Sequence, residues 1–247
     1  MLYFGLIGSS LSHSFSRNFF TAKFAAEQRA ADYSLIEVDD ISSIKNVIAK
    51  NGLVGFNVTI PYKESIIPYL DELSSEAKAI GAVNCVVVRD GKTIGYNTDI
   101  KGIEASIGWL STDENTKALI LGSGGASKAV QYILKKMGIE FKVVSRDISR
   151  GDITYTQLTA EIIREHQLII NTTPVGTAPN IEEAPMIDYT AIGESHQLFD
   201  LVYNPATTEF LRRGEAQGAN TMNGILMLQT QAIASWHIWQ RELNIEL

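Results

Sequence analysis

Apolar strand-like segments alternate with helical segments along most of this chain, and this alternation constrains the fold more than any other feature. A buried strand at residues 3–7 is followed by a helix at 17–28 and a second strand at 33–38. A helix to about residue 50 and a third strand at 56–60 repeat the pattern. Strands and helices that alternate at intervals of roughly thirty residues indicate parallel βαβ units. We therefore predict an α/β fold.

The remaining elements continue to the C-terminus and include one hairpin. Asp90-Gly91 is a hairpin turn signal between two β-prone segments, and the polar segment 111–115 indicates a boundary between layers. A chain of 247 residues can form one large or two small domains, each with its own core. Further strands are expected at residues 82–89, 92–96, 117–121, 141–144, 168–170 and 198–202, and further helices at 74–80, 100–109, 126–137, 156–166, 208–217 and 225–243.

Composition narrows the class of protein. Hydrophobic residues at 45% and charged residues at 20% are typical of a soluble globular chain, and a net charge of −7 is no footprint for nucleic acid or an anionic membrane. One cysteine, Cys85, excludes an intrachain disulfide, and four scattered histidines predict no metal site. The N-terminus lacks a signal-peptide pattern, and no apolar run is long enough to span a bilayer. We expect a cytoplasmic enzyme or binding protein.

A short apolar strand within Gly55 to Glu64 delivers polar side chains just beyond its end. Pro61 lacks an N–H group and therefore stops the strand, and Lys63 follows it. Ligands of open α/β sheets bind beyond the carboxyl ends of strands, so Asn57, Thr59 and Lys63 are candidates for contact with a small polar substrate. Lys63 could equally be an ordinary surface lysine after an edge strand.

Two further polar segments have both a structural and a functional interpretation. Residues 9–16 are rich in serine, and their hydroxyl groups suit a carboxylated or polyhydroxylated ligand, although Ser16 could simply cap the following helix. Asp99 could likewise be only the N-cap of the helix at 100–109. Alternatively, the hairpin before it places Asp99 beside the strand ends that carry Asn57 and Lys63.

The segment from residue 117 to 137 has the pattern of a dinucleotide-binding loop. A strand runs into Gly122 to Ser127 and a helix follows, which brings backbone N–H groups and the positive end of a helix dipole to one place. Any tight turn between a strand and a helix can also use glycines. After the next strand, Arg146 favours the 2′-phosphate of NADP, whereas the adjacent Asp147 favours the ribose hydroxyl of NAD.

Seven short motifs, in this order over most of the chain, resemble those of the shikimate dehydrogenase family. They are Ser12-His13-Ser14-Phe15-Ser16 (SxS), Asn57 to Glu64 (NVTxPxK), Gly81 to Asn84 (GAVN), Asn97-Thr98-Asp99 (NTD), Gly122 to Ser127 (GxGGAS), Asn171 to Gly176 (NxTxxG) and Tyr203 to Thr208 (YxPxxT). The segment GILMLQTQA, which contains Gln229, is similar to the family's GMLxxQA helix.

The resemblance implies two α/β domains and a defined reaction. Residues 1–99 and 223–247 would form the substrate-binding domain, and residues 100–222 a Rossmann-like NADP-binding domain, with the terminal helix returning to the first domain. The reaction would be the reversible reduction of 3-dehydroshikimate to shikimate by NADPH, a step in aromatic amino acid biosynthesis.

Roles for individual residues follow from the same resemblance. Reduction of a ketone needs a proton donor near the developing alkoxide, which we assign to Lys63, with Asp99 bonding the same hydroxyl and orienting the lysine. Substrate contacts would come from Ser14, Ser16, Thr59, Asn84, Tyr203 and Gln229. Cofactor contacts would come from Gly122, Ser123, Gly124, Gly125, Ala126, Ser127, Arg146, Asn171, Thr172, Thr173, Val202 and Gly224.

Two departures from the family pattern leave alternatives open. Ser145-Arg146-Asp147 stands where an NRT-like clamp is usual, and residues 219–224 replace a DGxGM-like segment near the nicotinamide. A quinate/shikimate dehydrogenase that uses NAD would share almost every motif. A non-catalytic sensor would have no need of both Lys63 and Asp99. The oligomeric state is open, with a homodimer as the working expectation.

Overall fold

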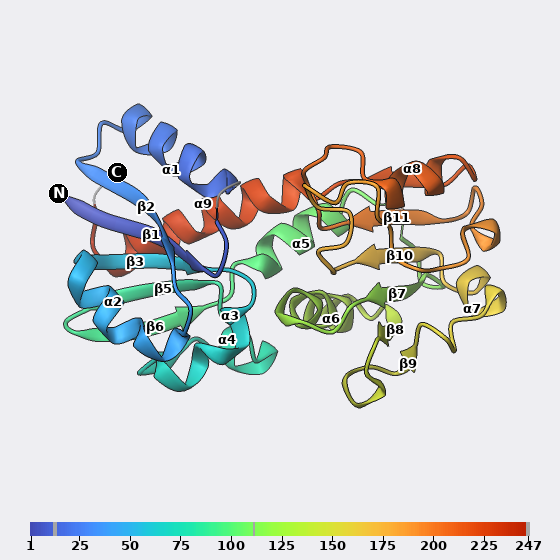
Figure 1. Cartoon of the computed structure of the whole chain (residues 1–247), viewed down its shortest axis with the longest axis horizontal. Helices are drawn as coiled ribbons and strands as arrows, with labels where there is room; N and C mark the ends of the chain where they lie inside the picture. Colours follow the sequence, from blue (N-terminus) through green and yellow to red (C-terminus); the bar gives the residue numbers. More distant parts are fainter. Residues whose placement is uncertain (12–13, 111, 246–247) are drawn as a thin grey trace. The chain divides into compact units, whose positions relative to one another are not determined.

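The structure, a computed structural model, describes residues 1–11, 14–110 and 112–245 and divides the chain into two compact units (Figure 1). Unit 1 consists of Met1–Thr98 and Gln231–Leu247, and unit 2 of Asp99–Thr230. Each unit has its own six-stranded sheet flanked by helices. The predicted α/β class with two domains is confirmed.

The sheet of unit 1 has the order β2-β1-β3-β5-β6-β4. Its strands are β1 (Leu2–Gly8), β2 (Ala31–Glu37), β3 (Leu53–Val58), β4 (Glu72–Leu73), β5 (Cys85–Arg89) and β6 (Lys92–Tyr96). β1 pairs in parallel with both β2 and β3, as the alternation of strands and helices predicts. The predicted hairpin forms antiparallel between β5 and β6, and β5 is also antiparallel to β3.

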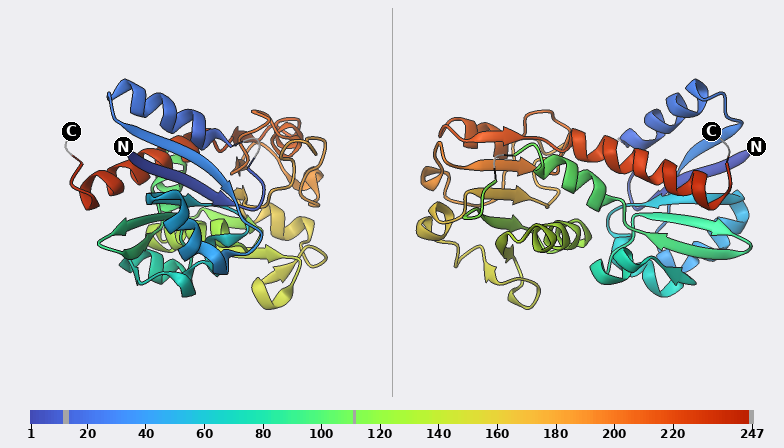
Figure 2. Two further views of the ribbon diagram at one scale, coloured as in Figure 1. Left: turned by 60° about the vertical axis from the view of Figure 1, so that its left-hand side comes forward. Right: turned by 180° about the vertical axis from the view of Figure 1, so that it is seen from behind.

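Helices cover both faces of this sheet (Figure 2). They are α1 (Phe15–Ala26), α2 (Ile44–Asn51), α3 (Tyr62–Ser65), α4 (Ser75–Ile80) and α9 (Ile225–Glu242), with 3₁₀ turns at Ile41–Ser43 and Ile67–Tyr69. α1 begins two residues before its predicted start because Ser14, rather than Ser16, is its N-cap and accepts from the Ser16 N–H at 3.2 Å. α2, α3 and α4 pack on one face, and α1 and α9 on the other.

The terminal helix is anchored in unit 1 by its tryptophans. The Trp239 ring lies 4.6 Å from that of Phe4 and 5.2 Å from that of Phe20, and its indole N–H donates to the Val86 carbonyl at 3.0 Å. The ring sits directly over Gly55, where an added Cβ would lie 2.6 Å from Nε1. The predicted return of the C-terminal helix to the first domain is therefore confirmed.

The sheet of unit 2 is wholly parallel, in the order β12-β11-β10-β7-β8-β9. Its strands are β7 (Lys117–Leu121), β8 (Glu140–Ser145), β9 (Ile153–Thr154), β10 (Leu168–Asn171), β11 (Gln197–Asp200) and β12 (Asn220–Met222). Counted from β7, this is the doubly wound order 3-2-1-4-5-6 of a dinucleotide-binding fold. The strand order reverses between β7 and β10, and ligands of such sheets bind at that point.

The helices of unit 2 differ most from the prediction at the start of α7 (Ala160–Arg164). They are α5 (Asp99–Ile107), α6 (Gly125–Met137), α7 (Ala160–Arg164) and α8 (Glu209–Glu215), with 3₁₀ turns at Ile148–Arg150 and Tyr189–Ala191. The helix predicted at 156–166 is wrong in its first turn because Thr159 caps α7 by accepting from the Ile162 N–H. Residues 154–157 instead form a hydrogen-bonded turn.

The close contact between Gly55 and Trp239 gives a test of this packing. Gly55→Ala should lower the free energy of unfolding by about 1–3 kcal/mol, because the new methyl group must displace an indole that is fixed on its other sides. Gly193→Ala is the matched control, since an added Cβ there meets nothing within 4 Å. Urea denaturation followed by tryptophan fluorescence measures both. Equal stability of the two variants would contradict the packing described for α9.

Candidate active site

The predicted substrate residues of unit 1 come from segments that meet at one edge of its sheet. β1 and β3 are parallel neighbours, so the loops after Gly8 and Val58 leave the sheet on the same side. Because β5 is antiparallel to β3, Asn57 lies opposite Cys85, and Asn84 therefore precedes β5 at this edge. β6 returns to the same edge, where Tyr96 pairs with Cys85.

The loops after β1 and β3 are packed closely against each other. The Thr59 N–H donates to the Ile7 carbonyl at 2.9 Å, and a Cβ on Gly8 would lie 2.7 Å from the Thr59 methyl group. The strand order reverses between β1 and its neighbour β3, which is the ligand-binding point of open α/β sheets. Ser12 and His13 of the predicted serine loop lie outside the described residues.

The Asn84 side chain is the centre of a buried polar network. Its Oδ1 accepts from the Thr98 N–H at 2.6 Å and from the Thr98 hydroxyl at 3.1 Å. Its Nδ2 donates to Oε1 of Gln231 at 3.3 Å. The network therefore fixes the residue that comes directly before Asp99.

A second part of this network runs beneath the sheet edge through Asn57. The Tyr33 hydroxyl donates to Asn57 Oδ1 at 2.9 Å, and Asn57 Nδ2 donates to the Asn84 carbonyl and to the Ser235 hydroxyl. Burial raises the pKa of Tyr33 well above its ordinary value, while a hydrogen bond with Ser16 acts in the opposite direction. Ser16, which we predicted as a substrate contact, is thus buried and tied to the same network.

Lys63 and Asp99 lie in the helices α3 and α5, which follow β3 and β6. Lys63 is half-buried in the short helix α3, and its carbonyl accepts from the Val83 N–H at 2.7 Å, beside Asn84. Asp99 is the first residue of α5 and is 2% exposed. Lys63 belongs to unit 1 and Asp99 to unit 2.

The structure separates the two glutamines near the start of α9. Gln229, the predicted substrate contact, is exposed and belongs to unit 2, whereas Gln231 is buried, belongs to unit 1 and bonds to Asn84. The helical spacing could have revealed this, because Gln231 lies on the buried stripe with Ser235 and Trp239. Tyr203 lies in unit 2, in the segment after β11.

In unit 2, the glycine-rich loop after β7 has the geometry that a pyrophosphate needs. Gly122 has a φ of +109°, and an added Cβ would lie 2.8 Å from the Thr172 hydroxyl, so only glycine fits. Gly124 is the N-cap of α6 without any side-chain cap, and a Cβ there would meet nothing within 4 Å. The first N–H groups of α6 thus face an open approach for a phosphate group.

The other predicted residues of this loop divide into two groups. Gly125 and Ala126 open α6, and the Ser123 hydroxyl lies 3.0 Å from that of Ser145 at the end of β8. Ser127 is fully buried, and its hydroxyl accepts from the Gln131 side chain at 3.1 Å. Its side chain therefore serves the packing of α6.

Two arginines, rather than one, follow β8. Arg146 is exposed directly after the strand, and Arg150, which sequence reasoning missed, donates to the Ser123 carbonyl of the glycine-rich loop at 3.1 Å. Asp147 accepts from the backbone N–H and the hydroxyl of Ser149, and these bonds lower its pKa. Its Oδ1 is thus committed to a local turn.

The turn after β10 is packed on the glycine-rich loop. The N–H and hydroxyl of Thr172 both donate to the Leu121 carbonyl, at 2.9 and 2.8 Å. Asn171 is fully buried and accepts from the N–H and hydroxyl of Thr173. These predicted cofactor residues therefore adjoin Gly122 at the reversal point of the sheet.

Val202 and Gly224, the remaining predicted cofactor residues, are also brought together. The Gly224 N–H donates to the Val202 carbonyl at 3.1 Å. An added Cβ on Gly224 would collide with the Leu201 carbonyl oxygen, so the close approach requires glycine.

Other parts of the described chain offer no comparable centre. An open hollow of about 430 Å³ beside α6 is lined by Gln131, Lys135, Phe141, Val143, Arg150, Gly151 and Asp152, none of which we predicted as a site residue. Among the described residues, no cluster of three histidine, cysteine or acidic side chains could hold a metal ion. Within the same residues, every helix is too short or too polar to cross a membrane.

Comparison with known proteins gives a consistent result. The model of the shikimate dehydrogenase substrate binding domain matches residues 6–86. The shikimate dehydrogenase (NADP(+)) of Methanococcus maripaludis strain C6 is 37% identical, over 95% of this chain and 90% of the relative.

Two solved structures cover nearly the whole chain. The shikimate 5-dehydrogenase of Thermus thermophilus, in complex with NADP(H) and shikimate, superposes with a TM-score of 0.86 at 29% identity, over 98% of this chain and 94% of that one. The quinate dehydrogenase of Corynebacterium glutamicum, in complex with NAD, gives 0.85 at 27% identity, over 97% and 94%. With the sequence similarity over nearly the full length and the strand orders described above, the chain belongs to the shikimate dehydrogenase family.

Proposed function

We propose that the protein is an NADP-dependent shikimate dehydrogenase, which reversibly reduces 3-dehydroshikimate to shikimate in aromatic amino acid biosynthesis. The observation that carries the proposal is the placement of Asn84, Thr98 and Gln231 at the strand edge that also bears Thr59 and Lys63. A relative named shikimate dehydrogenase (NADP(+)), which matches over 90% of its own length, supports the same activity.

We assign substrate binding to unit 1 and cofactor binding to unit 2. The matched substrate-binding family model lies within unit 1, and the doubly wound sheet with its glycine-rich loop lies in unit 2. The two compact units divide after Thr98 and after Thr230, whereas the sequence assigned Asp99 and residues 223–230 to the substrate domain.

NADPH, when bound, supplies the hydride for the ketone. Lys63 donates a proton to the developing alkoxide and accepts it in the reverse direction, which is general acid–base catalysis. Asp99 accepts a hydrogen bond from the same hydroxyl and orients the lysine. Ser14 and Ser16 would hold the substrate carboxylate.

The substrate ring would be oriented by polar side chains of the network. Thr59 and Asn84 keep the roles predicted from the sequence, as does Tyr203 from unit 2. We place Gln231, rather than Gln229, on the substrate, because it is buried beside Asn84. Read from Met227, the sequence MLQTQA matches the family's MLxxQA with the glutamine at 231.

The residues after β8 support NADP over NAD. The 2′-phosphate would be held by Arg146 and Arg150, which follow the strand on either side of the turn, with Arg150 touching the glycine-rich loop. Asp147, the residue that would favour NAD, uses Oδ1 to cap that turn. Gly122, the first N–H groups of α6 and the Thr172 turn would hold the pyrophosphate.

The quinate dehydrogenase that matches over nearly the whole chain supports a second candidate, a quinate/shikimate dehydrogenase that uses NAD. A non-catalytic sensor is a weaker candidate, because Lys63 and Asp99 are both present.

We also propose a cytoplasmic location and a homodimer. The single cysteine is consistent with a reducing compartment, and sedimentation velocity tests the dimer.

Purified protein should oxidise shikimate with NADP faster than any other pair among shikimate or quinate with NADP or NAD. Arg146→Ala and Arg150→Ala should each raise the KM for NADP by roughly tenfold, because each removes a charge-assisted bond to phosphate. The formation of reduced nicotinamide measures all four rates. Comparable rates with quinate and NAD would support the second candidate, and no turnover with any pair would support the sensor.

Substitution of Lys63, the proposed proton donor, should slow the chemical step. Lys63→Ala is expected to lower kcat by roughly 100-fold to 10,000-fold, the usual contribution of general acid–base catalysis. Lys78→Ala, an exposed lysine of α4, is the matched control and should retain the activity. Full turnover of the Lys63 variant would refute the catalytic assignment, and a change in shikimate KM alone would mean that Lys63 only positions the substrate.

Paired substitutions can distinguish the roles of Gln229 and Gln231 in α9. Gln231→Ala should raise the KM for shikimate by roughly tenfold, since it removes a buried partner of Asn84. Gln229→Ala should leave both KM values unchanged because its side chain is exposed. Initial-rate kinetics with each substrate varied in turn measures the effect. A larger effect at Gln229 than at Gln231 would contradict the assignment.

A further inference from the structure

Asp200 is a buried carboxylate to which the proposed reaction gives no role. It is the last residue of β11, it is fully buried, and it pairs in register with Asn171 at the end of β10. An acidic side chain removed from water in this way needs partners that compensate for its lost hydration.

Three donors from three segments compensate the carboxylate. Oδ1 accepts from the Asn171 side-chain amide at 2.9 Å and from the Val202 N–H at 3.0 Å. Oδ2 accepts from the Thr208 hydroxyl at 2.6 Å. Every partner is a donor, so the site suits an ionised carboxylate, which only accepts hydrogen bonds.

The first partner, Asn171, connects Asp200 to the glycine-rich loop. Asn171 uses its oxygen to hold both the N–H and the hydroxyl of Thr173, and an added Cβ on Gly122 would lie 2.9 Å from the Thr173 methyl group. One chain of contacts therefore runs from Asp200 through the turn after β10 to the segment that we propose for the pyrophosphate.

The second partner, Val202, connects Asp200 to Gly224, which is another predicted cofactor residue. The Val202 N–H is held by Asp200, and the Val202 carbonyl accepts from the Gly224 N–H. The family resemblance predicts both Val202 and Gly224 as cofactor contacts. Asp200 thus lies between two cofactor-binding segments and contacts both.

We propose that Asp200 is a positioning residue for the dinucleotide, whose carboxylate holds the turn after β10 and the segment after β11 in one arrangement. The inference rests on the proposed function, because it assumes that these segments bind NADP. Burial raises the pKa of Asp200 to about 6, while its bonds to Thr208, Val202 and Asn171 act in the opposite direction. The three donors around it favour the ionised form of the carboxylate.

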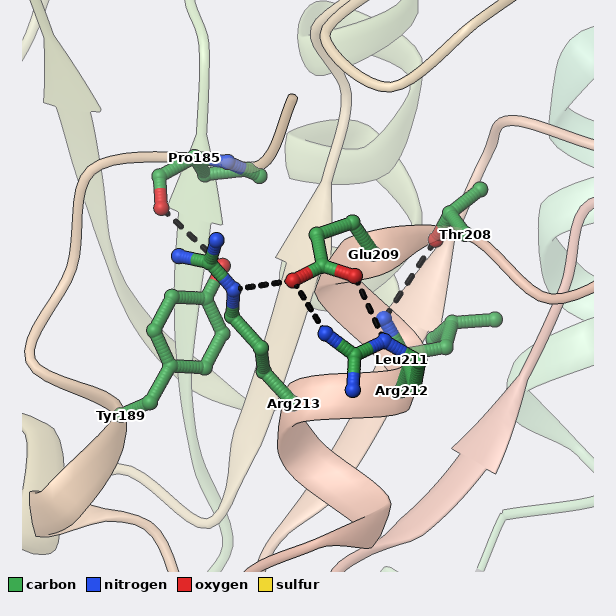
Figure 3. A network of polar contacts seen from close by, with 7 residues as sticks. All are labelled: Pro185, Tyr189, Thr208, Glu209, Leu211, Arg212 and Arg213. Atoms are coloured by element: carbon green, nitrogen blue, oxygen red, sulfur yellow. Dashed lines mark hydrogen bonds and ion pairs between the residues drawn. The ribbon is translucent and has the colours of Figure 1, made fainter. Parts of the chain in front are cut away.

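A nearby carboxylate provides a control for purely structural effects. Glu209 is also largely buried and lies one residue after Thr208, but its partners are Arg212 and Arg213 of the same helix, α8 (Figure 3). Arg213 in turn lies over the Tyr189 ring at 5.3 Å. This network joins α8 to the 3₁₀ turn at Tyr189–Ala191, which lies between β10 and β11, and none of its contacts involves Asn171, Thr173 or Val202.

The test compares Asp200→Asn, Asp200→Ala and Glu209→Gln in the full chain. Asparagine keeps the shape and one acceptor oxygen but lacks the charge, so this variant should fold even if the alanine variant does not. Binding of NADP alone, measured by calorimetry, is a readout independent of turnover. Thermal unfolding and the KM values for NADP and shikimate complete the set.

Asp200→Asn should weaken NADP binding by roughly tenfold while the KM for shikimate changes less than about twofold, because charge-assisted bonds are lost only near the cofactor. Glu209→Gln should lower the unfolding temperature and leave NADP binding unchanged. Hydrogen exchange of residues 171–176 and 201–208 should rise in the Asp200 variant alone.

Three results would overturn the inference. Wild-type NADP affinity in a folded Asp200→Asn variant would refute this inference but not the proposed function. An equal rise in the KM values for NADP and for shikimate would have the same meaning. Wild-type protein that binds no dinucleotide would refute both this inference and the proposed function.

Discussion

The hydrogen bonds of the Asn84 side chain are the interaction on which the candidate site most depends. They join the two ends of the β5–β6 hairpin to each other and to the C-terminal helix, which is far away in the sequence. Both ends of the amide are buried, so loss of one partner would leave an unsatisfied polar group at a cost of about 1–3 kcal/mol. Asp99 follows Thr98 directly, and the Lys63 carbonyl accepts from the N–H of Val83, the residue before Asn84. Both proposed catalytic residues are therefore attached to segments that this network holds in place.

The two units use the same physical principle in different sheets. In each, the strand order reverses beside the first strand, and the loops at that point are packed too closely for larger side chains at Gly8 and Gly122. Close packing fixes the loops, and hydrogen bonds hold the buried polar side chains Asn84 and Asn171 at the strand ends. In unit 2, the buried carboxylate of Asp200 bonds to both the turn after β10 and the segment after β11. Burial of this charge removes it from water, which is unfavourable without such partners.

The sequence was sufficient to predict the α/β class, the hairpin, the glycine-rich loop and the return of the last helix, because each depends on local periodicity or turn chemistry. It could not decide between two similar residues that are candidates for one role. Ser14 and Ser16 can both cap a helix, and backbone geometry decides for Ser14. Gln229 and Gln231 differ only in which side of α9 they occupy, and the buried stripe through Ser235 settles which one is inside.

Other features required the tertiary structure. Arg150 reaches the glycine-rich loop only because a 3₁₀ turn capped by Asp147 brings the chain back. Asp200 looks like an ordinary strand-end residue until its three partners are known. Contacts of this kind join residues distant in sequence and leave no local pattern.

The most direct test of the proposed mechanism is a crystal structure of the protein with shikimate and NADP bound together. We predict that one ring hydroxyl lies within hydrogen-bonding distance of both the Lys63 ammonium and the Asp99 carboxylate, with the substrate carboxylate on Ser14 and Ser16. Shikimate bound with Lys63 and Asp99 on different groups, or away from this edge of the sheet, would contradict the proposed mechanism.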